Sequence, residues 1–510
     1  MIKRILIANR GEIALRIIRA AREKNIKVVV PFSPFDIDGP WLERAEQIVP
    51  LEGYGCDNYL DGKVLIDIAK DYDCDAIHPG YGFLAEDPVF AGECLKQKIC
   101  FIGPNPEAIS LMGNKIRARA IMEKIGVPVV PGFTLDEENT SSSLEEKASK
   151  LGFPVLIKAA SGGGGRGMRI VHKKEELADC IASAQREAEV AFNDKTVYIE
   201  KYLQKPRHIE IQIAGDSKGK VLAFFERECS IQRRHQKLIE EAPSPFVDEC
   251  MRQQMIEAAV NAATGINYDN VGTVEFVAGR DGEKKVFYFL EVNTRIQVEH
   301  PVTEFITGVD LVKLQIELAC GSQIPFEQGE LKINGHSIEC RINAEDPYNN
   351  FRPTVGEITH FLNPGGAFVR FDSALRAGYT IPSQYDSLLG KLVVWGPDRA
   401  TAIGKMRAAL SELKIGGIVT TADFCSRLLN HPDFQKGEVD THFIPQAMPE
   451  LLSTLESEQK ALLPEAAIAA FLLEDRLKKS SATFPDRRGF QANRWNKLFR
   501  YDNLKSTLTR

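Results

Sequence analysis

Polar and apolar side chains alternate along the chain between residues 287 and 300. The segment opens with aromatic and aliphatic residues, which are typical of a strand. From there the even positions are mostly apolar and the odd positions are polar: Glu291, Asn293, Arg295, Gln297 and Glu299. Because successive residues of a strand lie on opposite faces, we expect one strand over 287–300, with two carboxylates, two amides and a guanidinium on one face.

The residues on that face could bind a metal ion and an anion. Glu291 and Asn293 offer hard oxygen ligands that suit Mg²⁺ or Mn²⁺, and a second predicted strand, Gly272–Val277, offers Glu275 beside them. Arg295 is a planar donor that fits a carboxylate, bicarbonate or phosphate, and Glu299 is placed to act as a base. Alternation alone favours an ordinary solvated edge strand, so the functional interpretation depends on the rest of the chain.

The first hundred residues alternate between short apolar runs and helical spacing. An apolar run at Lys3–Ala8, a helical pattern at Ile13–Lys24 and a second run at Val28–Pro31 predict a βαβ unit and a doubly wound parallel sheet. The first turn lacks Gly-x-Gly-x-x-Gly, so we do not predict a dinucleotide site. The glycine-rich loop His78–Glu86, with Tyr81, Phe83 and Glu86, is either part of a site or a plain structural turn.

A second glycine-rich run, residues 161–167, lies between the predicted strands Val155–Lys158 and Met168–Val171. So many glycines exclude a helix or strand interior, but they let backbone N–H groups approach a phosphate closely. We interpret the run as a mobile phosphate lid. The alternative, a flexible linker, is disfavoured because the strands bracket the run closely.

Two later segments predict a charged loop and an antiparallel region. Glu226–Lys237 is so dense in charge that we expect a solvated loop, and we expect its Cys229 to be a packed residue and not a nucleophile. From residue 335 on, short alternating runs predict an antiparallel region, interrupted at Tyr385–Lys391. Its predicted strands are Gly335–Glu345, Gly356–Leu362, Ala367–Asp372 and Lys391–Val394.

The last sixty residues differ in character. Leu451–Leu477 is rich in alanine, leucine and glutamate, which predicts a helix. Beyond Arg476 the chain is basic and carries the aromatic residues Phe484, Phe490, Trp495, Phe499 and Tyr501. We expect a docking segment for a partner subunit, with a nucleic-acid arm and a frayed terminus as alternatives.

Length and composition bound the class of protein. A chain of 510 residues suggests three or four domains of about 100–200 residues. The hydrophobic share of 44% and the charged share of 26% are ordinary for a globular protein, and a net charge of -6 argues against general nucleic-acid binding. Ten cysteines without a Cys-x-x-Cys pair argue against a zinc site or a disulfide scaffold. With no signal peptide or membrane-length apolar run, we expect a cytoplasmic protein.

Five motifs together carry a resemblance to a known family. They are Ile-Ala-Asn-Arg-Gly-Glu (7–12), His-Pro-Gly-Tyr-Gly-Phe-Leu (78–84), Lys-Ala-Ala-Ser-Gly-Gly-Gly-Gly-Arg-Gly-Met (158–168), Gln-Arg-Arg-His-Gln-Lys (232–237) and Asn-Thr-Arg-Ile-Gln-Val-Glu-His (293–300). From Ile5 to about Phe443 the chain resembles the biotin carboxylase component of biotin-dependent carboxylases, a branch of the ATP-grasp superfamily.

The resemblance implies an α/β (α+β) fold of several domains. A doubly wound, Rossmann-like N-terminal domain would span residues 1–112. An ATP-grasp domain would span 113–330, with a glycine-rich lid at about 131–203. A mixed C-terminal domain with short antiparallel strands would span 331–446, and a helical and basic extension 447–510.

The resemblance also implies a reaction, the carboxylation of biotin N1′ by bicarbonate and ATP through carboxyphosphate. ATP would be held by Lys115, Lys158, Gly164, Gly165, Glu200, Lys201, Tyr202, Leu203, His208, Gln232, His235, Glu275 and Glu291. Two Mg²⁺ or Mn²⁺ ions would be bound by Glu275, Glu291 and Asn293. Bicarbonate would be held by Lys237, Arg295, Gln297 and Val298. Glu299 would be the base, Arg341 would stabilise the biotin enolate, and Tyr81 and Arg341 would contact biotin.

The same resemblance implies which proteins this chain works with. No Ala-Met-Lys-Met attachment site is present, so biotin is expected on a separate carboxyl carrier protein, with carboxyltransferase subunits beyond it. We expect a homodimer that binds neither nucleic acid nor membrane and serves an acyl-CoA (such as acetyl-CoA, in fatty acid biosynthesis) or pyruvate carboxylase. The alternatives are another ATP-grasp ligase and a non-catalytic nucleotide-binding regulatory subunit. The joint presence of Arg295, Gln297, Glu299 and Arg341 argues against the first, and the retained Lys237, Glu291 and Glu299 argue against the second.

Overall fold

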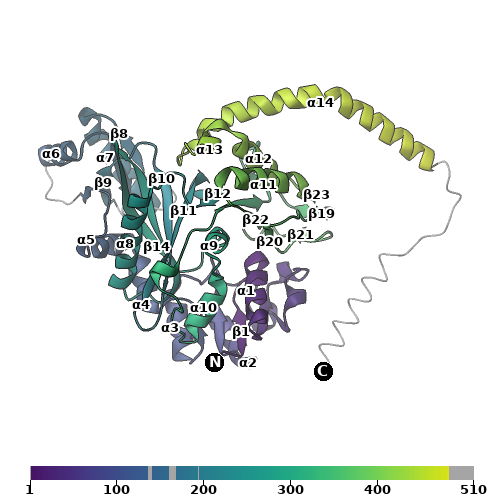
Figure 1. Ribbon diagram of the computed structural model, residues 1–510, viewed down its shortest axis with the longest axis horizontal. Coiled ribbons are helices and arrows are strands. Elements are labelled where there is room, and N and C mark those ends of the chain that lie inside the picture. Colours follow the sequence, from purple (N-terminus) through teal and green to yellow (C-terminus); the bar gives the residue numbers. More distant parts are fainter. Residues whose placement is uncertain (1, 136–140, 160–167, 193–194, 482–510) are drawn as a thin grey trace. The chain divides into compact units, whose positions relative to one another are not determined.

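The computed structural model describes residues 2–135, 141–159, 168–192 and 195–481 (Figure 1). The chain divides into two compact units, Met1–Ala447 and Met448–Arg510. The predicted basic, aromatic tail, from Phe484 to Tyr501, lies outside the described residues. None of the described helices combines the length and the apolar character needed to cross a membrane.

The N-terminal region forms the predicted parallel sheet. Its strand order is β3-β2-β1-β4-β5. The elements are β1 (Arg4–Ile7), α1 (Gly11–Glu23), β2 (Lys27–Phe32), β3 (Gln47–Pro50), α2 (Gly62–Asp71), β4 (Ala76–His78), α3 (Pro88–Lys96), β5 (Cys100–Phe101) and α4 (Pro106–Met112). Because β1 and β4 are neighbours, the loops that follow them meet: Asn9 Nδ2 donates to the carbonyls of Pro79 and Tyr81 at 2.7 Å each.

A four-stranded antiparallel sheet, in the order β6-β9-β7-β8, has a core of its own. It comprises β6 (Gly132–Thr134), α6 (Ser141–Leu151), β7 (Val155–Ala159), β8 (Arg169–Val171), α7 (Leu177–Phe192) and β9 (Val197–Lys201), and α5 (Lys115–Lys124) precedes it. The predicted phosphate lid, with Gly164 and Gly165, falls between β7 and β8 and lies outside the described residues.

An eight-stranded antiparallel sheet forms the body of the molecule, in the order β14-β13-β10-β11-β12-β15-β22-β20 (Figure 1). Pairing between β12 and β15 makes it continuous from the central region into the C-terminal one. Its strands and flanking helices are β10 (Arg207–Gly215), β11 (Val221–Arg233), β12 (Gln236–Ala242), α8 (Glu249–Gly265), β13 (Asn270–Asp281), β14 (Lys284–Asn293), α9 (His300–Thr307), α10 (Leu311–Ala319), β15 (His336–Asn343), β20 (Val369–Ser373) and β22 (Leu388–Gly396).

The C-terminal region adds the predicted short antiparallel strands and four helices. The strand pairs are β16 (Glu345–Asp346) with β17 (Arg352–Pro353), β18 (Gly356–Glu357) with β21 (Thr380–Ile381), and β19 (His360–Leu362) with β23 (Lys414–Gly416). The helices are α11 (Arg399–Glu412), α12 (Ala422–Asn430), α13 (Pro432–Lys436) and α14 (Phe443–Ser481). The helix predicted over Leu451–Leu477 is contained in α14.

The two faces of the large sheet differ in character. On one face, Ile209 and Ile211 of β10 pack with Met255 of α8 in a hydrophobic core. Alternate residues of β10 therefore lie on the other face, where Arg227 of β11 donates to Thr303 Oγ1 of α9 at 2.9 Å. Helix α8 thus packs against the apolar face, and Thr303 of α9 contacts the polar face.

Three expectations about local structure are wrong. The strand predicted over 287–300 ends at Asn293, because α9 begins at His300 with a proline in its first turn and the chain must turn before it. The charged segment from Glu226 is no solvated loop: it belongs to the hairpin β11–β12, and Glu226, Arg227 and Glu228 are buried. The interruption predicted at Tyr385–Lys391 is too long, because β22 already begins at Leu388.

Candidate active site

A row of charged residues crosses four adjacent strands of the polar face. Glu210 of β10 lies directly opposite Arg227 of β11 on one side and Glu275 of β13 on the other. Glu275 in turn lies opposite Glu291 of β14. Directly opposed residues share a face of the sheet, so three carboxylates and a guanidinium stand side by side. The structure therefore places Glu275 and Glu291 next to one another, as the alternation predicted.

Lys237 joins three carboxylates. Its Nζ lies 2.5 Å from Glu210 Oε2, 2.8 Å from Glu275 Oε1 and 2.7 Å from Glu299 Oε1. Burial alone would lower the pKa of Lys237, but Glu210, Glu275 and Glu299 raise it well above its ordinary value. The side chain is therefore an ammonium ion whose three hydrogens each have a carboxylate acceptor.

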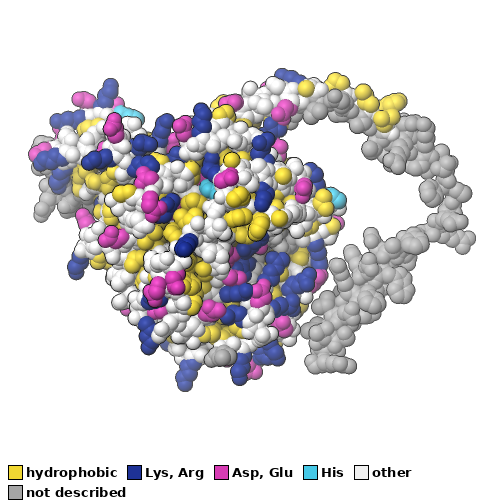
Figure 2. Space-filling model, viewed as in Figure 1, with side chains coloured by type: hydrophobic (Ala, Val, Ile, Leu, Met, Phe, Trp, Pro, Cys, Tyr) yellow, Lys and Arg dark blue, Asp and Glu magenta, His cyan; other side chains and the backbone are white. Residues whose placement is uncertain are grey.

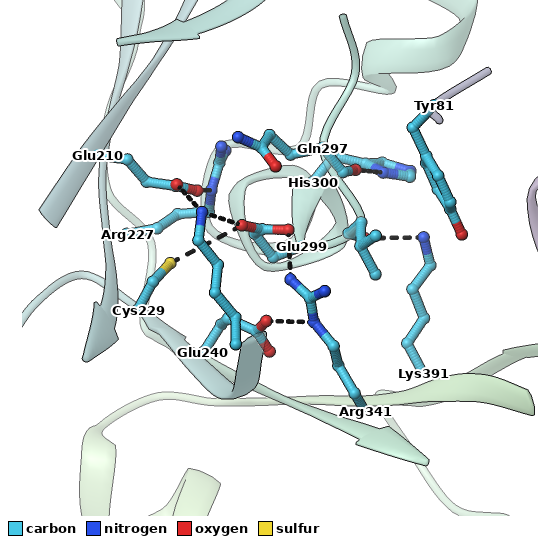
Figure 3. Close-up of polar contacts among 12 residues, drawn as sticks. Tyr81, Glu210, Arg227, Cys229, Glu240, Gln297, Glu299, His300, Arg341 and Lys391 are labelled. Carbon is cyan, nitrogen blue, oxygen red and sulfur yellow. Dashed lines mark hydrogen bonds and ion pairs between the residues drawn. The ribbon is translucent and has the colours of Figure 1, made fainter. Parts of the chain in front are cut away.

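Glu299 is fully buried between two cations (Figure 3). One carboxylate oxygen accepts from Lys237, and the other accepts from Arg341 Nη2 at 2.8 Å. Burial raises the pKa of Glu299, but Lys237, Arg341 and Arg227 outweigh this effect and hold it well below the usual range. Glu299 is thus a carboxylate, at the position just before α9.

Arg341 lies on β15 and is hydrogen-bonded to a residue of β12. Its Nε donates to Glu240 Oε1 at 2.5 Å, and Glu240 lies opposite Glu339 across the two strands. Burial raises the pKa of Glu240 to about 7, and burial together with Glu240 raises the pKa of Glu339 well above its ordinary value. Neither carboxylate oxygen of Glu339 has a hydrogen-bond partner within the part of the chain that the structure describes.

Arg295 ties the turn after β14 to the N-terminal region. Its Nε donates to Glu86 Oε2 at 2.8 Å, and its Nη2 donates to Asn293 Oδ1 at 3.0 Å. Gln297 accepts from Arg295 Nη1 at 3.2 Å and donates to Glu275 Oε1 at 3.0 Å. These side chains come together because the chain folds back after Asn293, and not because a strand continues.

The residues expected to hold ATP fall into two groups. Lys115 and His208 reach the carboxylate row, with Lys115 Nζ at 3.1 Å from Glu291 and His208 Nε2 at 3.1 Å from Glu275. Gln232 is paired with Lys237 across the β11–β12 hairpin, and His235 lies in its turn.

The second group lies at the lid sheet. Lys158 forms an ion pair with Glu200, and Lys201 forms one with Asp281 at 2.7 Å. Lys201, Tyr202 and Leu203 line a cavity of about 900 Å³. Gly164 and Gly165 lie outside the described residues.

The residues expected to bind metal fit a hard cation. Glu275, Glu291 and Asn293 offer carboxylate and amide oxygens on two paired strands, which is the donor type that Mg²⁺ and Mn²⁺ prefer. The ammonium groups of Lys115 and Lys237 already contact the two carboxylates, so positive charge is favoured there. His208 and Glu210 also lie close, with ligand atoms within 4.8 Å of one another and of Glu275.

Cys229 is a packed residue, as expected. It is fully buried, and its Sγ lies 4.0 Å from Glu299 Oε1. Burial, together with Glu210, raises the pKa of the Cys229 thiol well above its ordinary value, so the thiol stays protonated. A protonated thiol is a poor nucleophile.

Sequence reasoning missed several charged residues of the cluster. Glu210, Arg227, Glu240 and Lys391 are fully buried. Glu210, Glu240 and Lys391 contact predicted site residues or the turn that carries them, and Arg227 donates to Glu210. The alternation of residues 207–212 was the one available signal, since it puts Glu210 on the same face as His208.

Family models match three consecutive parts of the chain. The N-terminal domain of biotin carboxylase matches residues 1–109, the ATP-binding domain of the carbamoyl-phosphate synthase L chain matches 114–327, and the biotin carboxylase C-terminal domain matches 339–446. The biotin carboxylase of Nostoc sp. is 50% identical over 444 residues, which cover 87% of this chain and 98% of that protein. A pyruvate carboxylase subunit of Methanothermobacter thermautotrophicus is 49% identical over 447 residues, which cover 88% and 90%.

Solved structures agree with these relatives. The complex of Campylobacter jejuni biotin carboxylase with β-γ-ATP superposes with a TM-score of 0.80 at 45% identity, covering 88% of this chain and 99% of that one. The biotin carboxylase domain dimer of Hydrogenobacter thermophilus 2-oxoglutarate carboxylase, with MgADP, ADP and bicarbonate, gives a TM-score of 0.79 at 43% identity, covering 88% and 98%.

Proposed function

This chain belongs to the biotin carboxylase family of ATP-dependent ligases, and we propose that the cluster around Lys237, Glu299 and Arg341 is where bicarbonate is activated and biotin is carboxylated. One observation carries the assignment: a buried carboxylate is held between two cations, beside a pair of carboxylates suited to a nucleotide-bound metal. A base, an anion site and a metal platform therefore meet within one cluster.

Bicarbonate binds among the cations. Lys237, Arg295 and Arg341 supply positive charge, and Gln297 and the Val298 backbone N–H supply further donors. When the anion takes hydrogen bonds from Lys237 and Arg341, these cations stabilise the Glu299 carboxylate less. The pKa of Glu299 then rises from its depressed value, and Glu299 becomes a better base for the bicarbonate proton.

ATP lies along the carboxylate row. Glu275, Glu291 and Asn293 would hold Mg²⁺ or Mn²⁺, which would neutralise charge on the phosphates. Lys115 and Lys158 stabilise the charge that develops as the deprotonated bicarbonate attacks the γ-phosphorus to form carboxyphosphate and ADP. The adenine ring occupies the cavity beside Lys201, Tyr202 and Leu203.

Biotin reacts next to Arg341. Carboxyphosphate breaks down to CO₂ and phosphate, and the phosphate takes the proton from biotin N1′. The resulting enolate oxygen accepts hydrogen bonds from the Arg341 guanidinium while N1′ attacks CO₂. Tyr81, from the loop after β4, packs against the biotin ring.

The assembly is part of the same proposal. Biotin arrives on a carboxyl carrier protein, and carboxyltransferase subunits complete the carboxylase in the cytoplasm. The dimeric domain of the H. thermophilus relative supports a homodimer. We assign the N-terminal domain to 1–112, the ATP-grasp domain to 113–330, the C-terminal domain to 331–446 and the extension to 447–510.

Release of ADP tests the proposal. The purified chain is assayed with Mg²⁺ and bicarbonate, with and without free biotin. We expect ADP release that requires bicarbonate and rises with biotin. Turnover indifferent to biotin would identify another ATP-grasp ligase, and bound ATP without turnover would identify a regulatory subunit.

A further inference from the structure

Lys391 is a fully buried cation beside the cluster. Its Nζ donates to the carbonyl of Val298 at 2.8 Å and lies 3.2 Å from Glu12 Oε1. Figure 3 shows the side chain running from β22 toward the turn that carries Gln297 and Glu299, with Tyr81 beside it. The Tyr81 ring centroid lies 5.9 Å from Nζ, and the Tyr81 hydroxyl donates to the same Glu12 oxygen.

Three distant segments meet at this ammonium group. Glu12 lies in the first turn of α1 in the N-terminal region, Val298 lies in the turn between β14 and α9, and Lys391 lies on β22. Among the described residues, no other group donates a hydrogen bond to the Val298 carbonyl. The contact therefore fixes the peptide that links Val298 to Glu299.

Lys391 also lies directly opposite Arg341 across β15 and β22. Two cations on adjacent strands thus bind two successive residues. Arg341 binds the Glu299 carboxylate, and Lys391 binds the Val298 carbonyl. Asp372 of β20 lies opposite Lys391 on its other side and offsets part of the repulsion from Arg341, but a buried ammonium group is still costly. Replacing both members of a buried ion pair by apolar side chains is often neutral or stabilising, so stability alone does not account for Lys391 and its partner Glu12.

We propose that Lys391 is a positioning residue for the bicarbonate site: it orients the Val298–Glu299 peptide, and Glu12 holds the ammonium group in place. The role rests on the proposed function, since it presumes that the Val298 N–H and the Glu299 carboxylate receive bicarbonate. The ammonium group contacts Val298, Glu12 and the Tyr81 ring, none of which is a nucleotide or metal residue of the proposed site. Loss of Lys391 should therefore weaken bicarbonate binding and leave ATP binding unchanged.

The test replaces Lys391 by Met and measures ADP release with free biotin, varying bicarbonate or ATP. We expect the KM for bicarbonate to rise about tenfold or more, as for the loss of one hydrogen bond from a charged donor, while the KM for ATP stays unchanged. Lys405→Met is the matched control. Lys405 Nζ also donates to backbone carbonyls: that of Trp395, at the far end of β22, at 2.7 Å, and that of Ala367 at 3.0 Å.

Two further variants separate positioning from stability. Lys391→Met combined with Glu12→Gln removes both charges, leaves the Tyr81 hydroxyl an acceptor, and should recover thermal stability while the KM for bicarbonate stays high. Recovery of that KM together with stability would assign Lys391 a structural role only. Glu12→Gln alone keeps the ammonium group and should raise the same KM by a smaller factor.

Two further outcomes separate failure of this inference from failure of the proposed function. A KM for bicarbonate equal to that of the wild-type chain in Lys391→Met, or in Glu12→Gln where the lysine variants do not fold, overturns the inference. A wild-type chain whose ADP release ignores bicarbonate and biotin overturns the proposed function instead, so the two failures are distinguishable.

Discussion

Replacing Lys237 by Met removes one ammonium group from among three carboxylates. In the wild-type chain Nζ lies 2.5 Å from Glu210, 2.8 Å from Glu275 and 2.7 Å from Glu299. A hydrogen bond to a charged group contributes about 1.5–3 kcal/mol, but three bonds of one ammonium group are not independent. Loss of one partner from a buried ion pair costs about 3–5 kcal/mol. We expect the free energy of unfolding at about pH 8 to fall by about 4 kcal/mol.

The loss should depend on pH in a defined direction. In the wild-type chain the pKa values of Glu275 and Glu299 are held well below normal, so both groups stabilise the fold above the unfolded-state pKa of about 4.3. Without Lys237, burial dominates and both pKa values rise. The folded variant then binds protons that the unfolded chain does not, so its deficit should shrink as the pH falls from about 8 towards about 5.5.

Urea unfolding followed by circular dichroism measures this deficit at both pH values. Lys285→Met is the control. Lys285 lies on β14 of the same sheet, and its Nζ contacts the Phe246 carbonyl at 2.7 Å and the exposed Asp248 at 2.8 Å. An exposed pair of this kind is worth about 0.2–1 kcal/mol. A Lys237→Met deficit no larger than that of the control, or one that does not change with pH, would refute a charged and buried cluster.

Three further predictions concern single carboxylates. Glu291→Gln removes a metal ligand and should raise the Mg²⁺ concentration for half-maximal ADP release about tenfold or more; an unchanged metal titration would contradict this. Glu299→Gln removes the base and should lower biotin-dependent ADP release about a hundredfold or more, with nucleotide binding retained by fluorescence titration. Glu339→Gln should stabilise the fold at about pH 8. Burial raises the pKa of Glu339 in the folded state. The wild-type chain therefore loses stability as the pH rises from the unfolded-state pKa to the folded-state pKa, and the glutamine variant does not. Urea unfolding should show that this advantage disappears towards about pH 5, and equal stability at both pH values would count against it.

Local patterns were sufficient to predict that Glu275 and Glu291 are neighbours. The strand-like segment 272–277 and the alternation in 287–293 report directly on two strands, and the structure pairs Glu275 with Glu291. The parallel N-terminal sheet was predictable for a similar reason, because its short apolar runs and helical spacings alternate strictly along the sequence.

The same periodicity misled beyond Asn293. The odd positions Arg295, Gln297 and Glu299 continue the pattern by coincidence, whereas the chain turns there to start α9. Pro301 was the usable signal, because proline is common in the first turn of a helix. The polar residues still converge, since Gln297 reaches Glu275 and Glu299 reaches Lys237 from the turn.

Buried charges could not be predicted from their neighbours in sequence. Residues 226–228 look like a solvated run because their partners are far along the chain: Glu226 is bound by Arg252, and Glu228 is bound by Ser244. Which charge meets which depends on the register of β10, β11, β12 and β15, and no local pattern encodes it. On the surface, by contrast, lysine and arginine side chains are interspersed with acidic and apolar ones over the visible face (Figure 2).

Attack of bicarbonate on the γ-phosphate of ATP at this cluster is the proposed first step of the reaction. Bicarbonate labelled with ¹⁸O, incubated with the chain, Mg²⁺, ATP and free biotin, tests it directly by mass spectrometry of the released phosphate. Each released phosphate should carry one oxygen atom from bicarbonate, and Glu299→Gln should slow the transfer about a hundredfold or more. Phosphate without the label, released at the rate of ADP, would contradict it.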